Sequence, residues 1–264
     1  DPTFLNELRR IIAIEFENAG EFNIPQGKVI TTLSGIDPSS FSISDESQTL
    51  DTDLNGLDEF NGEVIDEDIS EIIYSGAKYK HDLLADFETQ VRVDICYLYQ
   101  TRATTSVCLK EKATDREIDD PCQVNLDNVD VFSSGAPLQI TEVSRRSSGT
   151  HEVQLTFKVE NQGSGLVYLP DTFNQECVKD EDNEDRAEIA IYTGSGRHRV
   201  ECNILGGAST GEIKLINNER FVRCNIDTSS APSSAIQEPI NIVLDYFYRN
   251  AIQKSLIVED SEES

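Results

Sequence analysis

The sequence predicts an all-β protein made of two copies of one antiparallel β-sandwich. Two segments echo each other: residues 16–20 (FENAG) return as 159–163 (VENQG), and residues 91–99 (VRVDICYLY) return as 240–248 (INIVLDYFY). The second copies follow the first by about 143 and about 149 residues, and self-similarity at this spacing indicates a duplicated domain. Between the echoes, short runs of alternating apolar and polar residues are separated by turns, as half-buried strands are.

The first predicted domain spans residues 1–128. Ile12, Ile14 and Phe16 alternate with more polar residues and predict a strand that ends in a turn at 18–20. Further strands are expected at 29–33, 41–44, 91–98 and 105–109, the last two forming a hairpin about a turn at 100–104. Helical spacing is present more weakly at 3–10, 66–73 and 115–119, and an acidic loop covers 45–71.

The second predicted domain spans residues 129–264 and ends in an acidic tail at 259–264. The second copy of the hairpin is expected to run along 240–248 and to return along 252–258. The other predicted strands are 138–143, 153–159, 166–169, 188–192, 199–204, 212–216 and 221–226. Six or more short strands separated by turns indicate an antiparallel β-sandwich.

The two copies differ at their leading strand. Residues 137–143 form a predicted strand before the second echo, whereas only residues 1–10 precede the first. Either residues 1–10 are a shortened first strand, or the missing strand lies upstream or comes from another chain. Strand addition to an open sheet edge is an established route of assembly.

The net charge of −27 restricts the possible partners. Such a field repels phosphate backbones and anionic membrane surfaces, which excludes nucleic acid and lipid headgroups as partners. No apolar run approaches the length of a membrane helix, so membrane contact is expected only through a tether outside this chain. The chain contains no methionine, and Asp1 is expected to be a processed or truncated end. The even spread of acidic residues favours a halophilic surface over a set of divalent-cation sites.

The cysteine count predicts disulfides and an oxidising environment outside the cytoplasm, with buried free thiols as the alternative. The six candidates are Cys96, Cys108, Cys122, Cys177, Cys202 and Cys224, and none has the spacing of a zinc site. Cys202 with Cys224 is the easiest pair to close, followed by Cys108 with Cys122 or with Cys96. Because three cysteines lie on each side of the predicted boundary, full pairing requires a bridge between the predicted domains. Cys177 is then expected to reach Cys96 or Cys122.

One acidic segment resembles the start of a calcium-binding loop. Its candidate oxygen ligands are Asp51, Asp53, Asn55, Asp58 and Glu59, and Gly56 stands at the position that turns such loops. Gly62 occupies the place of the closing carboxylate, so a solvated acidic loop is the alternative. The run at 180–185 (DEDNED) is a weaker candidate of the same kind. No cofactor other than calcium is expected.

Catalytic motifs are absent from the sequence. The three histidines, His81, His151 and His198, are far apart, and no nucleophile elbow, zinc-protease motif or phosphate loop occurs. The residues 193–198 (TGSGRH) are expected to form a hairpin turn. Tyr97, Tyr99, Tyr246 and Tyr248 are positioned to pack across strands, with sugar stacking as the alternative. We therefore expect a protein that is not an enzyme.

The stretch 153–168 (VQLTFKVENQGSGLVY) is similar to the N-x-G strand and turn of secreted immunoglobulin-like adhesion modules of the CARDB type. Together with 95–108 (ICYLYQTRATTSVC), the chain also resembles archaeal surface proteins that are tethered by an upstream pilin-like segment. These resemblances imply two tandem immunoglobulin-like sandwiches in an exported, non-enzymatic protein. We expect an extracellular or cell-surface structural, adhesion or filament-type protein of a halophilic organism, with other protein chains as partners. A calcium- or carbohydrate-binding accessory module is the alternative.

Overall fold

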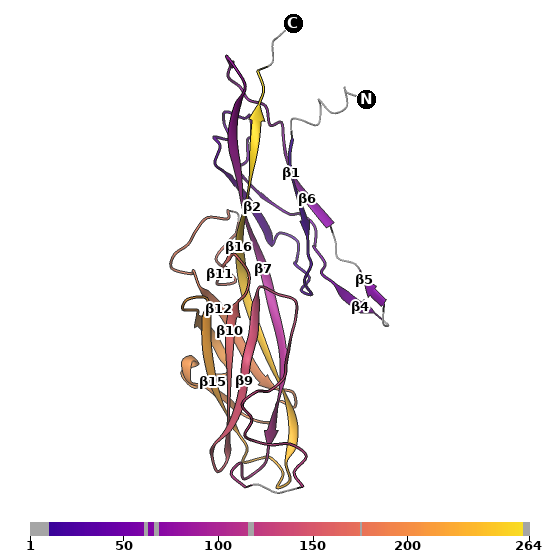
Figure 1. Ribbon diagram of the computed structural model, residues 1–264, viewed down its shortest axis with the longest axis vertical. Coiled ribbons are helices and arrows are strands. Elements are labelled where there is room, and N and C mark those ends of the chain that lie inside the picture. Colours follow the sequence, from indigo (N-terminus) through magenta and orange to yellow (C-terminus); the bar gives the residue numbers. More distant parts are fainter. Residues whose placement is uncertain (1–10, 61–62, 66–68, 116–118, 175, 261–264) are drawn as a thin grey trace. The chain divides into compact units, whose positions relative to one another are not determined.

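The computed structural model describes residues 11–60, 63–65, 69–115, 119–174 and 176–260. Among these residues the chain is almost entirely antiparallel β-structure, and its one helical element is the 3-10 turn η1 (Asn203–Leu205). The chain forms two compact units (Figure 1). Unit 1 contains residues 1–98, 171–181 and 247–264, and unit 2 contains 99–170 and 182–246. The all-β fold class is thus confirmed, whereas the units differ from the continuous domains 1–128 and 129–264 that the sequence predicts.

Unit 1 has two main sheets. One pairs β1 (Ile11–Glu17) with β6 (Ile69–Ser75). The other places β2 (Val29–Ser34) between β3 (Ser47–Thr49) and the first part of β7 (Phe87–Leu109), followed by the last part of β16 (Ile236–Val258). A short ribbon pairs β4 (Asp58–Phe60) with β5 (Glu63–Ile65).

The helix expected at 66–73 is wrong where it is described, because Ile72 and Tyr74 are buried at the two-residue period of strand β6. The strand expected at 41–44 is also wrong, since the chain turns there and Ser42 has a φ of 60°.

A buried tyrosine joins the two main sheets of unit 1. The Tyr74 side chain is inaccessible to solvent, and its hydroxyl lies 2.7 Å from Thr31 Oγ1 on β2. A phenol removed from water needs such a partner, because an unpaired buried hydroxyl would cost free energy of folding. Burial also raises the pKa of Tyr74.

Unit 2 has two larger sheets. The first has the order β13 (Val200–Cys202), β15 (Glu219–Asp227), β10 (Glu152–Asn161) and β9 (Leu138–Gly149). The second has the order β14 (Thr210–Lys214), β12 (Arg186–Thr193), the first part of β16 and the last part of β7. β8 (Val131–Ser133) pairs with this part of β7, and β11 (Leu166–Tyr168) pairs with β16. These elements confirm the predicted strands of the second half, with ends shifted by a few residues.

The core of unit 2 lies between its two sheets. Leu155 and Phe157 on β10 and Leu244 on β16 are inaccessible to solvent. The hydroxyl of buried Tyr246 accepts a hydrogen bond from Leu138 N (3.3 Å) and lies 3.0 Å from Thr101 Oγ1. As in unit 1, a buried tyrosine joins the sheets. The sheets of each unit are consistent with a sandwich, while the immunoglobulin-like topology stays a prediction.

The two predicted hairpins do not exist. β7 and β16 are each uninterrupted strands of 23 residues, so the turns expected at 100–104 and after Tyr248 are wrong. The segment 100–104 (QTRAT) contains no glycine, proline or asparagine, and its threonines favour extended backbone. Each long strand therefore gives its first part to one unit and its last part to the other.

The duplication inferred from sequence is visible in the strand order of each unit. In unit 1 the order is β3, β2, β7, β16, and in unit 2 it is β14, β12, β16, β7, so the two long strands exchange roles. The second sheets correspond too, because β1 pairs with β6 as β10 pairs with β15. Unit 2 adds β13 and β9 at the ends of this sheet. The repeat is thus a repeat of topology, with extra strands in the second copy.

All six cysteines form disulfides, and the structure selects among the pairings that the sequence left open. Cys108 pairs with Cys122, and Cys202 pairs with Cys224 directly across β13 and β15. Cys96 pairs with Cys177 at a sequence separation of 81. This bridge crosses the boundary predicted near residue 128, yet both residues belong to unit 1.

Candidate functional site

The clearest difference between the two copies is a strand edge. In unit 2, β10 has two partners, β15 on one side and β9 on the other. In unit 1, the equivalent strand β1 pairs only with β6 among the described residues. Within the described part of the chain, no strand therefore lies beside β1 in the place where β9 lies beside β10. We call this side of β1 the open edge.

Side chains next to the open edge are incompletely buried. Residues 12 and 16 correspond to 155 and 159 in the repeat. Leu155 and Val159 are inaccessible to solvent, whereas Ile12 and Phe16 are only half-buried. The difference has a direct cause in unit 2, where β9 buries Leu138, Ile140 and Val143 beside β10; no described strand does this beside β1.

The last part of β16 shows the same lack of cover. Its residues Ile252 and Ile257 correspond to Ala103 and Cys108 on β7. Ala103 is 2% exposed and Cys108 is fully buried, but Ile252 is 50% exposed and Ile257 is 64% exposed. In unit 2, β8 pairs with β7 at Ala103, and β8 leads into β9 through only four residues. The segment that covers both places in unit 2 has no described counterpart in unit 1.

The exposed face of β1 carries acidic groups. In unit 2, Lys158 on β10 binds Glu142 of β9 at 2.5 Å and also approaches Glu160 and Glu219. Hydrogen bonding to Glu142 raises the pKa of Lys158. At the equivalent position β1 has Glu15, whose cross-strand partner is Glu71. The charge at this single position is therefore the reverse of that in unit 2.

The predicted calcium ligands belong to a loop that is held by other contacts. Leu54 is buried and bridges to Ile24, and Gly56 packs tightly against the backbone of Gly20. Asp53 Oδ1 accepts a hydrogen bond from Gln26 N at 2.7 Å, and Asp51 and Asn55 are exposed. Asp58 and Glu59 lie in β4, whose side chains are outside the described residues. Calcium binding stays a prediction, and calorimetric titration with CaCl2 tests it.

The acidic run at 180–185 likewise lies in a turn. Lys179 pairs with Glu181 at 3.6 Å, and the Tyr168 hydroxyl donates to Glu184 at 3.3 Å.

In the described part of the chain, no group of three or more His, Cys, Asp or Glu side chains could hold a metal ion. Within the same part, no helix is long and apolar enough to cross a membrane.

The predicted tyrosines pack across the long strands. Tyr97 and Tyr248 have ring centroids 5.7 Å apart in unit 1, and Tyr99 and Tyr246 are 6.2 Å apart in unit 2. Tyr99, Tyr246 and Tyr248 are buried, as the packing interpretation expects. The histidines lie in separate places: His81 packs on Tyr79, His151 contacts Glu111 O, and His198 contacts Asp227 O.

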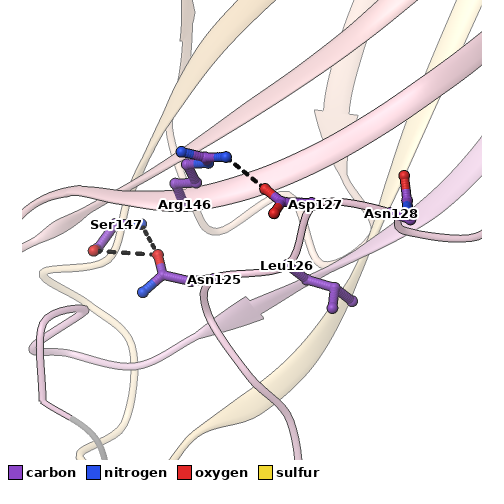
Figure 2. Close-up of a pocket in the computed structure, with 6 residues that line it drawn as sticks. All are labelled: Asn125, Leu126, Asp127, Asn128, Arg146 and Ser147. Carbon is purple, nitrogen blue, oxygen red and sulfur yellow. Dashed lines mark hydrogen bonds and ion pairs between the residues drawn. The ribbon is translucent and has the colours of Figure 1, made fainter.

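A hollow of about 570 Å³ lies in unit 2, between the loop residues 125–128 and strand β9. Figure 2 shows its lining residues, Asn125, Leu126, Asp127, Asn128, Arg146 and Ser147. Arg146 pairs with Asp127 at 2.5 Å, and Ser147 N donates to Asn125 Oδ1 at 2.7 Å. These contacts attach the loop to β9. The polar groups therefore already serve a structural role.

An ion-pair cluster around the buried Asp94 in unit 1 was not expected from the sequence. Asp94 on β7 accepts hydrogen bonds from Arg92 and from Arg249 on β16, each at 2.8 Å, and from Ser34 Oγ at 3.2 Å. Burial by itself would raise the pKa of Asp94, but the two arginines outweigh burial and lower it. In the sequence the one available signal is a single aspartate inside the apolar alternation of 91–99.

Comparisons with known proteins place the chain in no family. No family model matches it, and no curated protein matches it. One solved structure is similar, the envelope protein VP37 of White Spot Syndrome Virus, with 12% sequence identity over 57% of this chain and 97% of that chain. The TM-score is 0.26, at which the similarity carries no argument about fold or function.

Proposed function

We propose that this chain is a non-enzymatic structural protein of an extracellular or cell-surface assembly. The observation that carries the proposal is the set of three disulfides, one within unit 1 and two within unit 2. Disulfides persist in oxidising compartments, and they stabilise modules whose strands must survive outside the cell. Two β-units that are each stabilised by disulfides suit a protein that bears mechanical load or displays a binding surface.

The acidic surface supports a setting in concentrated salt. Acidic residues outnumber basic ones by 49 to 22, and this excess repels itself strongly at low ionic strength. In concentrated salt this repulsion is screened beyond a distance of about 3 Å. We accordingly propose that the protein comes from a halophilic organism. The same proposal includes an archaeal source and a role in adhesion.

The test is the form of the native material. Electron microscopy of protein purified from its source in high salt is expected to show an extended or surface-bound assembly. Peptide mapping under non-reducing conditions is expected to recover the Cys96–Cys177 link. Discrete monomers at high concentration in that salt, or free thiols in the native protein, would contradict the proposal.

A further inference from the structure

We infer that the outer face of the second sheet of unit 2 is a self-association surface, on which two copies of this chain meet about a twofold axis. The inference rests on the proposed function and names the surface through which copies of the chain bind one another. Two exposed aromatic side chains carry it. Phe132 on β8 is 76% exposed, and Tyr192 on β12 is 48% exposed.

Both aromatic side chains belong to one row that crosses four strands. Phe132 is the cross-strand partner of Thr104 on β7. Thr104 Oγ1 donates a hydrogen bond to Asn241 Oδ1 on β16 at 3.1 Å, and Asn241 is the cross-strand partner of Tyr192. Thr104 is exposed between two buried neighbours on β7, so this row lies on the outer face of the sheet. We call these four residues the aromatic row. Three strand spacings, about 14 Å, separate its two ends.

The aromatic row and the side chains next to it contain no carboxylate. Ala190 and Val243 are cross-strand partners on the same face and are partly exposed. Arg102 on β7 is exposed beside them. A chain with a net charge of −27 repels a second copy of itself over most of its surface. Two copies therefore approach at the lowest electrostatic cost where both surfaces lack carboxylates and present apolar groups.

Unit 1 shows that the fold does not require this composition. Through the repeat, Asn241 corresponds to Arg92. Tyr192 corresponds to Ser34, since each is the cross-strand partner of the residue just compared. In unit 1 both equivalents bind the carboxylate of Asp94. The same face thus carries an ion-pair cluster in unit 1 and an uncharged, aromatic surface in unit 2.

The aromatic row is complementary to itself about a twofold axis. An axis parallel to the strands and midway between β7 and β16 brings Phe132 of one copy opposite Tyr192 of the other, twice in each dimer. The same axis brings the Thr104 hydroxyl, which can accept, opposite the Asn241 amide, which can donate. Two sheets that pack face to face with nearly aligned strands lie about 10 Å apart, a distance that facing aromatic side chains fill. Twofold contacts of this kind are the commonest in homo-oligomers.

The first experiment measures association of the full chain by sedimentation equilibrium over a range of protein concentrations in concentrated KCl. We expect a dimer whose dissociation constant rises by at least about tenfold in Phe132→Ser and in Tyr192→Ser, because each substitution removes two aromatic contacts per dimer. The matched control is Phe221→Ser, which removes a 45% exposed aromatic residue from β15 in the other sheet of unit 2. The control should dimerise like the unmodified chain. Circular dichroism establishes that all three variants are folded.

The second experiment tests the axis by cross-linking. All six native cysteines are in disulfides, so a thiol added by substitution is the one that reacts. Chains with Phe132→Cys and chains with Tyr192→Cys are treated with a short bifunctional maleimide, separately and as a mixture, at a concentration where each dimerises. The mixture is expected to cross-link because these positions face each other. Either variant alone is expected to cross-link poorly, because its two thiols lie about 14 Å apart across the row.

Three results would overturn the inference. They are monomers of the unmodified chain at every concentration, a dimer that is unchanged in folded Phe132→Ser or equally weakened in Phe221→Ser, and equal cross-linking of the single variants and the mixture. The first would assign the row to another occupant, such as a neutral carbohydrate. The second and third leave the proposed function standing, since the native assembly would then use another surface or axis. Free thiols in the native protein would contradict the proposed function and leave the dimer unaffected.

Discussion

Asn18 and Asn161 make the same two hydrogen bonds at equivalent points of the repeat. Each Oδ1 accepts from a glycine N–H two residues later, Gly20 at 3.3 Å and Gly163 at 3.1 Å. Each Nδ2 donates to the carbonyl four residues later, Phe22 at 2.7 Å and Gly165 at 2.9 Å. Both side chains are buried, so the turn that follows β1 and β10 depends on an amide.

Replacement of either asparagine by alanine is expected to destabilise the protein by about 1–3 kcal/mol, because buried backbone groups lose their partners. The control is Asn→Asp, which keeps the Oδ1 acceptor and loses the Nδ2 donor, and which should also be destabilising. Urea unfolding followed by tyrosine fluorescence measures the change. A side chain that merely fills space would tolerate both substitutions.

Asp94→Asn is expected to lower stability by about 2–3 kcal/mol at neutral pH, since Arg249 would lose its carboxylate partner while mostly buried. The pKa of Asp94 is lowered in the folded chain, so its contribution is present above the usual value of 3.8 and is lost as pH falls through the folded value. Urea midpoints measured across acidic pH should therefore converge for the two proteins at the acid end. A difference that is constant with pH would contradict this assignment.

Removal of single disulfides is expected to cost different amounts. The sequence separations are 81 for Cys96–Cys177, 22 for Cys202–Cys224 and 14 for Cys108–Cys122. In the chain-entropy model, closing these loops contributes about 4.5, 3.4 and 3.0 kcal/mol. Paired Cys→Ala variants, compared by urea unfolding, should follow this order. If all three variants were equally stable, loop entropy would not govern their contributions.

Glu71→Lys is expected to stabilise unit 1 by about 0.5 kcal/mol at low salt, because Glu15 and Glu71 are direct cross-strand partners. Glu71→Gln is the control, and it should give a smaller gain by removing repulsion without adding attraction. Thermal unfolding at low and high KCl measures both. The gain from lysine should fade in high salt as the charges are screened.

The unmodified chain is expected to become more stable as KCl rises from about 0.1 M to about 2 M, since the net charge of −27 repels itself most at low salt. Calorimetry over this range, with and without EDTA, measures the effect. A gain that needs calcium would instead support the loop of Asp51, Asp53 and Asn55 as a calcium site.

Much of the fold could be predicted from local pattern. Alternation in 12–16 and 153–159 requires strands with one buried face, and the burial of Ile14 and Phe157 agrees with it. The paired echoes indicated duplication because both copies keep the residues that a shared turn and a shared long strand need. The sequence indicated the candidate site only as an asymmetry: the second copy has a leading strand at 137–143, and the first copy has no clear counterpart.

The continuity of β7 and β16 was decided by tertiary structure. A strand that continues and a strand that turns back have the same two-residue period, so alternation cannot distinguish them. The pairing of Cys96 with Cys177 was decided in the same way, because strand order brings together residues 81 positions apart. By itself the sequence determined the strands, the duplication and the charge, which are local or additive properties. Which strand lies beside which depends on long-range pairing that only the folded chain specifies.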